Sequence, residues 1–295
     1  MPIYMNSICV QCLLGKRLPL ARSLGDDKTA TRFARQLMAE FLYHPHGIDS
    51  THLGAIADQM LISLYGIEPD RLKAEKDASN RFVLDRLPQI RSRVEQSADP
   101  IYAALQFAVL GNYLDFSALQ GEVSFDTLDG MLDSAAQMEL DKTCYQAFLS
   151  DLKAGKKLLY ITDNAGEIAF DRVLAEQLKK AYPHLNILFC VRGSPVSNDA
   201  TREDAQAVGI DFPVIDNGTA IGGTVIDLIS QEAKQAIEDA DVILAKGMGN
   251  TESMFGCGYN VYYAFLVKCD RFIQYFGKPK MTPMFIRDTK AAEEH

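Results

Sequence analysis

Residues 156–174 read "KKLLYITDNAGEIAFDRVL", and this stretch decides the fold because an apolar run passes directly into a polar turn and then into a second periodic segment. The run at 156–162 has the length and composition of a buried strand, and the pattern from residue 167 onward is typical of an amphipathic helix. Between them, Asp163, Asn164 and Glu167 place two carboxylates and one amide at the end of the strand. An ordinary turn needs only one such residue. The rest of the chain must explain the cluster.

The C-terminal part of the chain repeats this order of strand and helix. Strands that are apolar on both faces and alternate with helices predict a mainly parallel sheet covered on both sides, an α/β fold of Rossmann-like type. Further strands are predicted at 185–192, 212–216, 241–247, 260–270 and 283–287, and helices at 167–183, 200–209 and 224–240.

Residues 1–155 have a different pattern, which predicts a mainly helical N-terminal region before an α/β region at 156–295. Apolar residues recur at helical spacing, and no strand pattern precedes residue 156. Asp99 stands before Pro100, a typical start for a helix. The predicted helical segments include 31–44, 80–96 and a long one at 126–155 that ends near Gly155.

Composition excludes several classes of protein. The 295 residues carry a formal net charge of -9 and no long Lys/Arg run, which argues against nucleic acid or an anionic membrane as partner. The sequence contains no apolar stretch of 18 residues, so no transmembrane helix is predicted, and the N-terminus is a poor signal peptide. Six cysteines are too few for a disulfide scaffold, so we expect a cytoplasmic protein. The oligomeric state is not predicted.

Polar residues follow the other predicted strands as well. Asn198 and Asp199 follow the second strand, and the fourth is followed by "KGMGNTES", with Lys246 and Asn250. The carboxyl ends of parallel strands lie at one edge of a sheet, so these loops should converge there. Carboxylate and amide oxygens suit hard cations such as Mg²⁺ or Mn²⁺, and a lysine beside a metal suits a phosphate.

Each motif alone has a simpler interpretation. An Asp-Asn pair after a strand is more often a helix cap or a turn. A nucleotide-binding or methyl-transfer Rossmann domain is an alternative, although the first strand lacks a glycine-rich turn. Asn112 and Asp115 lie three residues apart, on one face of a helix. They either cap that helix or close over the sheet edge and complete the site.

Cys9 and Cys12 form a CxxC pair near the N-terminus. They could be half of a zinc site, a redox pair, or apolar residues at the start of a helix. A zinc site needs two further ligands, and no second CxxC is present. We expect packing or a weak redox role and assign no metal here.

Several motifs occur in the order found in one family. They are "CVQCLL" at 9–14, "KDASNRFVLDRLPQI" at 76–90 with Asn80, "GNYLDF" at 111–116, "LLYITDNAGEIAFDRVL" at 158–174, "PVSNDAT" at 195–201 and "AKGMGNTES" at 245–253. The chain resembles the family once called domain of unknown function eighty-nine, now described as metal-dependent damage-control phosphatases. The CxxC makes it most similar to the prokaryotic branch. The resemblance covers nearly the whole chain.

The resemblance implies a helical part packed on a Rossmann-like sheet and hydrolysis of phosphate monoesters of small metabolites, either sugar phosphates or damaged phosphometabolites. It implies a divalent cation (Mn²⁺, Ni²⁺, Co²⁺ or Mg²⁺) and a small phosphorylated metabolite as a partner. The alternatives are an S-adenosylmethionine-dependent carboxyl methyltransferase and a non-catalytic metal- or phosphate-binding protein. The implied metal ligands are Asp163, Asn164 and Asp199, the implied phosphate contact is Lys246, and the implied residues around the substrate are Asn112, Asp115, Glu167, Asn198 and Asn250.

The nucleophile is either Asp163 or a water molecule. A carboxylate that serves as a metal ligand is a poorer nucleophile, so we expect attack by water, with a carboxylate as base. The DxDxT pattern of enzymes that form an aspartyl-phosphate is absent, because Ala165 stands where its second Asp would be.

Overall fold

The computed structural model describes residues 3–44, 48–114, 130, 132 and 135–288. Its centre is a six-stranded sheet in the order β3-β2-β1-β4-β5-β6, which confirms the predicted mixed α/β fold with a mostly parallel sheet. Among the strands that the structure describes, only β6 runs antiparallel, beside β5 at the edge. The strands are β1 (Lys157–Ile161), β2 (Asn186–Val191), β3 (Val214–Asp216), β4 (Val242–Lys246), β5 (Val261–Leu266) and β6 (Pro283–Arg287).

Alternate residues of each strand point to opposite faces of the sheet, and both faces are covered by helices. In β1, Leu158 and Tyr160 belong to one apolar core, and Leu159 and Ile161 belong to the other. The first core is covered by α4 (Lys73–Gln96), α5 (Pro100–Gly111), α7 (Lys142–Ala154), α8 (Glu167–Ala181) and α9 (Arg202–Ala207). The second is covered by α10 (Gln231–Asp239), α11 (Gly247–Met254) and α12 (Asp270–Phe276).

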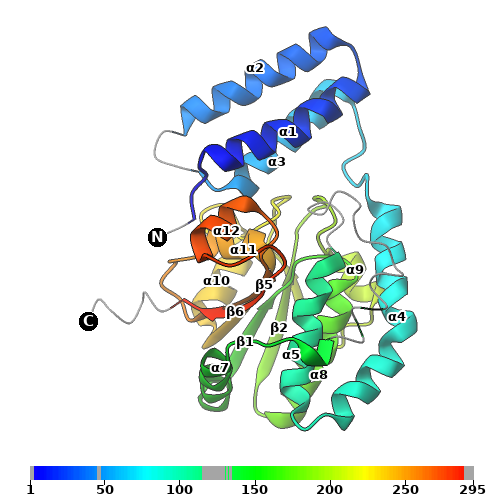
Figure 1. Ribbon diagram of the computed structural model, residues 1–295, viewed down its shortest axis with the longest axis vertical. Coiled ribbons are helices and arrows are strands. Elements are labelled where there is room, and N and C mark those ends of the chain that lie inside the picture. The colour runs from blue at the N-terminus through cyan, green and yellow to red at the C-terminus, as the bar shows by residue number, and fades with distance from the viewer. Residues whose placement is uncertain (1–2, 45–47, 115–129, 131, 133–134, 289–295) are drawn as a thin grey trace.

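Three N-terminal helices form a layer with a small apolar core of its own, which includes Phe33, Leu37 and Leu61. They are α1 (Ser7–Leu24), α2 (Asp27–Tyr43) and α3 (Ser50–Tyr65). The layer lies at the end of the molecule where α11 and α12 are found (Figure 1). Glu252 on α11 joins the two parts, because its carboxylate accepts hydrogen bonds from the Ser50 backbone N–H (2.6 Å) and hydroxyl (2.8 Å).

The predicted strands are confirmed, although the one predicted at 260–270 ends at Leu266, and four details of the helices are wrong. Residues 138–141 are not helical, because Asp141 caps the start of α7. The helix predicted at 224–240 begins only at Gln231, where Ser230 is the N-cap. The segment after β4, predicted as a loop, is the helix α11, and α12 was not predicted. The division into regions at residue 155 stays a prediction.

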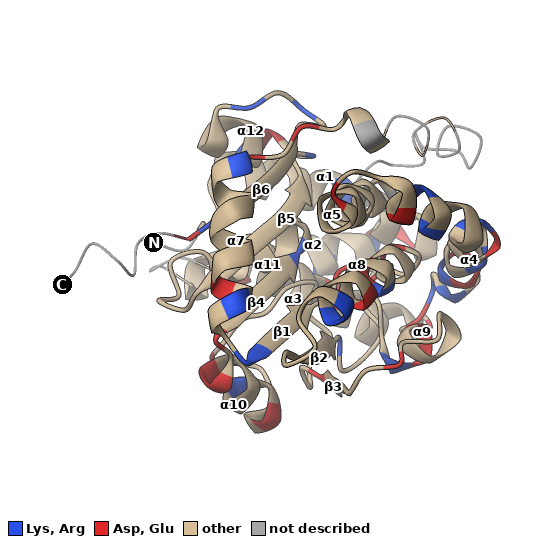
Figure 2. Cartoon of the chain, turned by 90° about the horizontal axis from the view of Figure 1, so that it is seen from below, with Lys and Arg blue, Asp and Glu red and all other residues tan. Residues whose placement is uncertain are grey.

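Charged residues lie mainly on the helices and connections, whereas the central strands carry few of them (Figure 2). This distribution is expected for a parallel sheet that is buried on both faces. In the described part of the chain, no helix is long and apolar enough to cross a membrane.

Candidate functional site

The loops that follow β1 and β2 are joined to each other by their backbones at the carboxyl edge of the sheet. Asn164 and Asp199 form an isolated antiparallel bridge. The Ala200 N–H donates to the Asp163 carbonyl oxygen (2.7 Å), and the Ala165 N–H donates to the Asn198 carbonyl oxygen (2.8 Å). The structure therefore brings together Asp163, Asn164 and Asp199, which the sequence places in two separate loops.

Two side-chain amides hold the first of these loops. The Asn112 Nδ2 group, at the end of α5, donates to Asp163 Oδ2 (2.9 Å) and to Glu167 Oε2 (3.0 Å). Asn164 Nδ2 donates to the same two oxygens, at 2.7 and 2.8 Å. Asn112 Oδ1 accepts from the Leu266 N–H (3.2 Å), which fixes this amide against β5. Asn112 thus belongs to the site, while Asp115 lies outside the described residues.

Lys246 is the last residue of β4 and lies at the centre of what we call the Lys246 cluster, formed by Lys246, Glu167, Asp171 and Tyr160. The Lys246 ammonium donates to Glu167 Oε1 (2.7 Å), Asp171 Oδ1 (2.7 Å) and the Ala108 carbonyl oxygen (2.8 Å). These three bonds use all three of its protons. Burial alone would lower the pKa of Lys246, but Asp171 and Glu167 raise it overall. Burial, together with Glu167, raises the pKa of Asp171 to about 7 despite the lysine.

Arg192, at the end of β2, is buried at the centre of what we call the Arg192 cluster, formed by Arg192, Asp199, Asn250 and Thr224. Its Nε donates to Asp199 Oδ2 (2.7 Å), and its Nη1 donates to Asn250 Oδ1 (3.0 Å). The Nη2 group has no hydrogen-bond partner in the described structure and lies 3.8 Å from Asp163 Oδ1. Sequence reasoning missed this residue, because a single arginine after a strand resembles a surface charge.

Asn250 is a structural member of the site, because it lies in the first turns of α11 and not in a loop. Its Nδ2 donates to the Thr162 and Lys246 carbonyl oxygens, at 3.0 and 2.7 Å. Gly247 begins the same helix with a φ of +78°, and a Cβ atom placed there would overlap with Asp163 Oδ2. The Asp163 carboxylate therefore needs glycine at position 247.

The electrostatics of the site are dominated by carboxylates. The pKa of Asp163 is raised well above its ordinary value, first by burial and then by Asp199 and Glu167, while Arg192 and Lys268 lower it. Lys268 is a buried residue beyond the end of β5, and sequence reasoning missed it too. The ionised form of Asp163 is therefore disfavoured in the protein alone.

The CxxC pair lies apart from these clusters, in the first turns of α1. Cys9 is buried and Cys12 is exposed. Burial raises the pKa of the Cys9 thiol. Among the described residues, no group of three or more His, Cys, Asp and Glu side chains could hold a metal ion. The metal ligands predicted at the strand ends, Asp163, Asn164 and Asp199, are not such a group, because Asn164 carries an amide.

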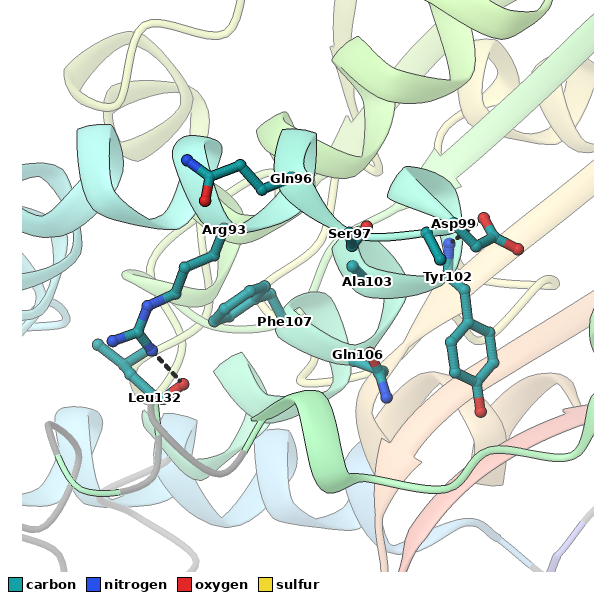
Figure 3. A pocket seen from close by; sticks show the side chains of 10 residues that line it. Arg93, Gln96, Ser97, Asp99, Tyr102, Ala103, Gln106, Phe107 and Leu132 are labelled. Atoms are coloured by element: carbon teal, nitrogen blue, oxygen red, sulfur yellow. Dashed lines mark hydrogen bonds between the residues drawn. The ribbon is translucent and has the colours of Figure 1, made fainter.

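A cavity of about 620 Å³ lies between the end of α4 and the first half of α5 (Figure 3). Arg93 in its wall donates to the Leu132 carbonyl oxygen (2.8 Å), and Gln106 donates to the Met138 carbonyl oxygen (2.6 Å). Asp99, also in the wall, caps α5 and accepts from the Tyr145 hydroxyl. These polar groups connect structural elements, and none of them belongs to the strand-end site.

Comparison with known proteins places these features in context. The model of the damage-control phosphatase ARMT1-like domain matches residues 5–282. An uncharacterized protein of Methanocaldococcus jannaschii is 31% identical over 278 residues, with 88% of each chain covered. A damage-control phosphatase of Archaeoglobus fulgidus is 30% identical over 257 residues, covering 85% of this chain and 87% of the relative. The crystal structure of a DUF89 family protein from Pyrococcus horikoshii superposes with a TM-score of 0.81 at 23% identity, covering 97% and 99% of the two chains.

Proposed function

The chain belongs to the damage-control phosphatase ARMT1-like family, and we propose that it is a metal-dependent phosphatase that hydrolyses phosphate monoesters of small metabolites. One observation carries the proposal: two loops joined by their backbones bring Asp163, Asn164 and Asp199 together at the carboxyl edge of the sheet. Ligands of α/β proteins bind at this edge. Sugar phosphates or damaged phosphometabolites are the substrate class we propose, in the cytoplasm.

These three residues suit a hard divalent cation. Asp163 and Asp199 offer carboxylate oxygens, and the Asn164 Nδ2 group donates to Asp163 and Glu167, which leaves its amide oxygen as the ligand atom. The charge also fits, since burial, Asp199 and Glu167 together disfavour ionised Asp163 until a cation is near. Mn²⁺, Ni²⁺, Co²⁺ and Mg²⁺ are the candidates. When bound, such a cation supplies Lewis-acid catalysis to a phosphoryl group.

The substrate phosphate would be held by cations of the protein. Arg192 has an Nη2 group without a hydrogen-bond partner in the described structure, 3.8 Å from Asp163 Oδ1, and a guanidinium suits phosphate recognition. Lys268 is near enough to Asp163 to lower its pKa. We also propose a phosphate contact for Lys246. In this structure its three ammonium protons are bonded within the protein, so the contact requires one of these bonds to be exchanged. Asn112, Glu167, Asn198 and Asn250 complete the proposed surroundings of the substrate.

We favour attack by water over attack by Asp163. Asp163 Oδ2 accepts hydrogen bonds from both Asn112 and Asn164, so its electron density is already engaged by two donors. A carboxylate that also serves as a metal ligand is a poor nucleophile. We propose a carboxylate of the site, Asp163 or Asp199, as the base that accepts the proton from water.

The test is hydrolysis of p-nitrophenyl phosphate by protein freed of metal, before and after each of the four cations is restored. Turnover that vanishes with chelator and returns with a cation supports the proposal. Turnover unchanged after exhaustive chelation would exclude the metal. Cation binding without turnover of any phosphorylated metabolite would identify a binding protein, and a thermal shift with S-adenosylmethionine would favour the methyltransferase.

A further inference from the structure

Asn80 on α4 contacts the turn that carries Asp163 and Asn164 and also the first turn of α9, the helix that follows the loop carrying Asp199. Its Oδ1 accepts a hydrogen bond from the Gly166 N–H (2.6 Å), and its Nδ2 donates to Asp204 Oδ1 (2.9 Å). Gly166 ends the turn that contains Asp163 and Asn164, and Asp204 lies in the first turn of α9, five residues after Asp199. Asn80 is buried, so both bonds are shielded from water.

Asp204 is itself held in place by several donors. Its Oδ2 accepts from the Thr201 N–H and hydroxyl, both at 2.9 Å, in a capping box at the start of α9. The buried Lys76 ammonium lies 3.0 Å from the same oxygen. Because Asp204 contacts a cation and accepts hydrogen bonds from three further donors, its carboxylate has a fixed orientation. Asn80 can therefore position the Gly166 turn relative to it.

The turn after β1 is therefore joined directly to the loop after β2 and, at a separate place, to the helix that follows that loop. On one side, their backbones pair through Asn164 and Asp199 and through the Ala200 N–H. On the other side, Asn80 connects the Gly166 N–H to Asp204. Gly166 has a φ of +77°, so its turn depends on a particular backbone conformation, and its N–H would be left buried without Asn80.

We propose that Asn80 is a positioning residue that sets the distance between the ligand pair Asp163–Asn164 and the ligand Asp199. The inference rests on the proposed function in one respect, since the consequence of the spacing is measured as metal affinity. It assigns to the helical N-terminal region a role in the site that does not require contact with substrate. Groups that orient metal ligands from outside typically change metal affinity by about 10- to 100-fold.

The geometry allows a rescue experiment. In Asn80→Asp, two carboxylates face each other across a hydrogen-bond distance, and in Asp204→Asn, two amide nitrogens can face each other. When both substitutions are combined, the carboxylate introduced at position 80 accepts from the Gly166 N–H and from the amide introduced at position 204, whose oxygen still faces Thr201 and Lys76. The exchanged pair keeps the net charge and the connection, with one hydrogen bond reversed.

Mn²⁺ affinity is measured by calorimetry on metal-free protein for the wild type, both single variants, the exchanged pair and Asn80→Ala. Ser79→Ala is the matched control, because Ser79 is a buried neighbour whose hydroxyl donates to the Glu75 carbonyl oxygen of its own helix. We expect the single variants and Asn80→Ala to bind Mn²⁺ about 10- to 100-fold more weakly than wild type. The exchanged pair and the Ser79→Ala control should bind Mn²⁺ within about threefold of wild type. Unchanged affinity in Asn80→Ala, or a folded exchanged pair that binds as weakly as the singles, overturns the proposal.

Amide hydrogen exchange separates this inference from the proposed function. In metal-free protein, Asn80→Ala should accelerate exchange in peptides that cover 163–168 and 197–204 and leave β5 unchanged. If wild-type protein binds none of the four candidate cations, the proposed function fails, and the exchange result alone then decides whether Asn80 connects the Gly166 turn to α9. Equal exchange in wild type and Asn80→Ala overturns the connection itself.

Discussion

Two buried cations at strand ends, Lys246 and Arg192, differ in how many of their N–H donors are bonded within the protein. In the Lys246 cluster, all three ammonium protons are bonded to Glu167, Asp171 and Ala108. In the Arg192 cluster, Nε and Nη1 are bonded, whereas Nη2 has no hydrogen-bond partner in the described structure. The first cluster is a closed internal ion network. The second keeps one buried donor, Nη2, that makes no hydrogen bond in the described structure and lies 3.8 Å from Asp163 Oδ1.

The largest effect should come from the ligands themselves. Asp163→Ala and Asp199→Ala should each lower kcat by at least about three orders of magnitude, as expected when one member of a catalytic unit is removed. Both proteins should still fold, although Asp199→Ala leaves the buried Arg192 without its bonded carboxylate and should melt at a lower temperature. Steady-state kinetics and thermal melting measure this, with the surface variant Asp239→Ala as control. Wild-type turnover in either variant would reduce that residue to a helix cap.

Lys246→Met should act first on stability. It leaves Glu167 and Asp171 buried without their cation, which should lower the free energy of unfolding by about 3–5 kcal/mol. Denaturant unfolding measures this. The double variant Lys246→Met, Asp171→Asn should recover part of the loss, because one carboxylate is then neutral. Unchanged stability with a lowered kcat/KM would instead support the phosphate contact that the sequence predicts for Lys246.

Arg192→Lys keeps the positive charge but removes the fork of N–H groups. We expect kcat/KM to fall by roughly 100-fold, the scale of one lost preorganised donor, with a smaller loss of stability than in Lys246→Met. Kinetics and melting on the same preparation compare the two clusters directly. If kcat/KM is unchanged, the unpartnered Nη2 group does not contact the substrate and the two clusters are functionally alike.

Glu252 shows what burial does to a carboxylate that no cation contacts directly in the described structure. Burial raises its pKa from the ordinary value of 4.5 to about 7, with Asp49 adding to the rise and Arg271 opposing it, while Cys9 on α1 also lies near. Because the folded-state pKa is the higher one, this carboxyl stabilises the fold fully below pH of about 4.5, and the contribution is lost as pH rises through about 7. The loss is about 3 kcal/mol at most.

Unfolding free energies of wild type and Glu252→Gln between pH of about 4.5 and about 8 test this. The variant should lose the part of the pH dependence that comes from Glu252, and the contact between α3 and α11 should persist through Ser50. Identical pH profiles would show that Glu252 titrates as an ordinary exposed carboxyl.

The smallest effect is expected for the double variant Cys9→Ser, Cys12→Ser. Both residues lie on α1, outside the two clusters, so kcat/KM should stay within about threefold of wild type, as for a substitution that has no shared partner with the site. Metal analysis accompanies the assay. Stoichiometric zinc lost with the thiols, or a folded but inactive variant, would give the CxxC pair a role in function.

The sheet and the meeting of its loops could be predicted from sequence, because both depend on short-range patterns. Strand β1 and the turn at Asp163 are contiguous, and parallel strands end at one edge. The helix α11 was missed because Gly247 and Gly249 are poor helix formers, and their need for small size arises from contacts with Asp163 and Gly222. Likewise, the closed state of Lys246 depends on Asp171 and Ala108, which are 75 and 138 residues away in the chain.

Gly247 also limits which substitutions the protein tolerates. An L-residue at this position faces both an unfavourable φ of +78° and a carboxylate that overlaps with its Cβ, so no single substitution is neutral. Gly258 has a similar φ of +85° but nothing within 4 Å of an added Cβ, so a substitution there would be strained by the backbone conformation alone. A mutational path through position 247 would therefore have to move Asp163 at the same step, which makes the two positions change together or not at all.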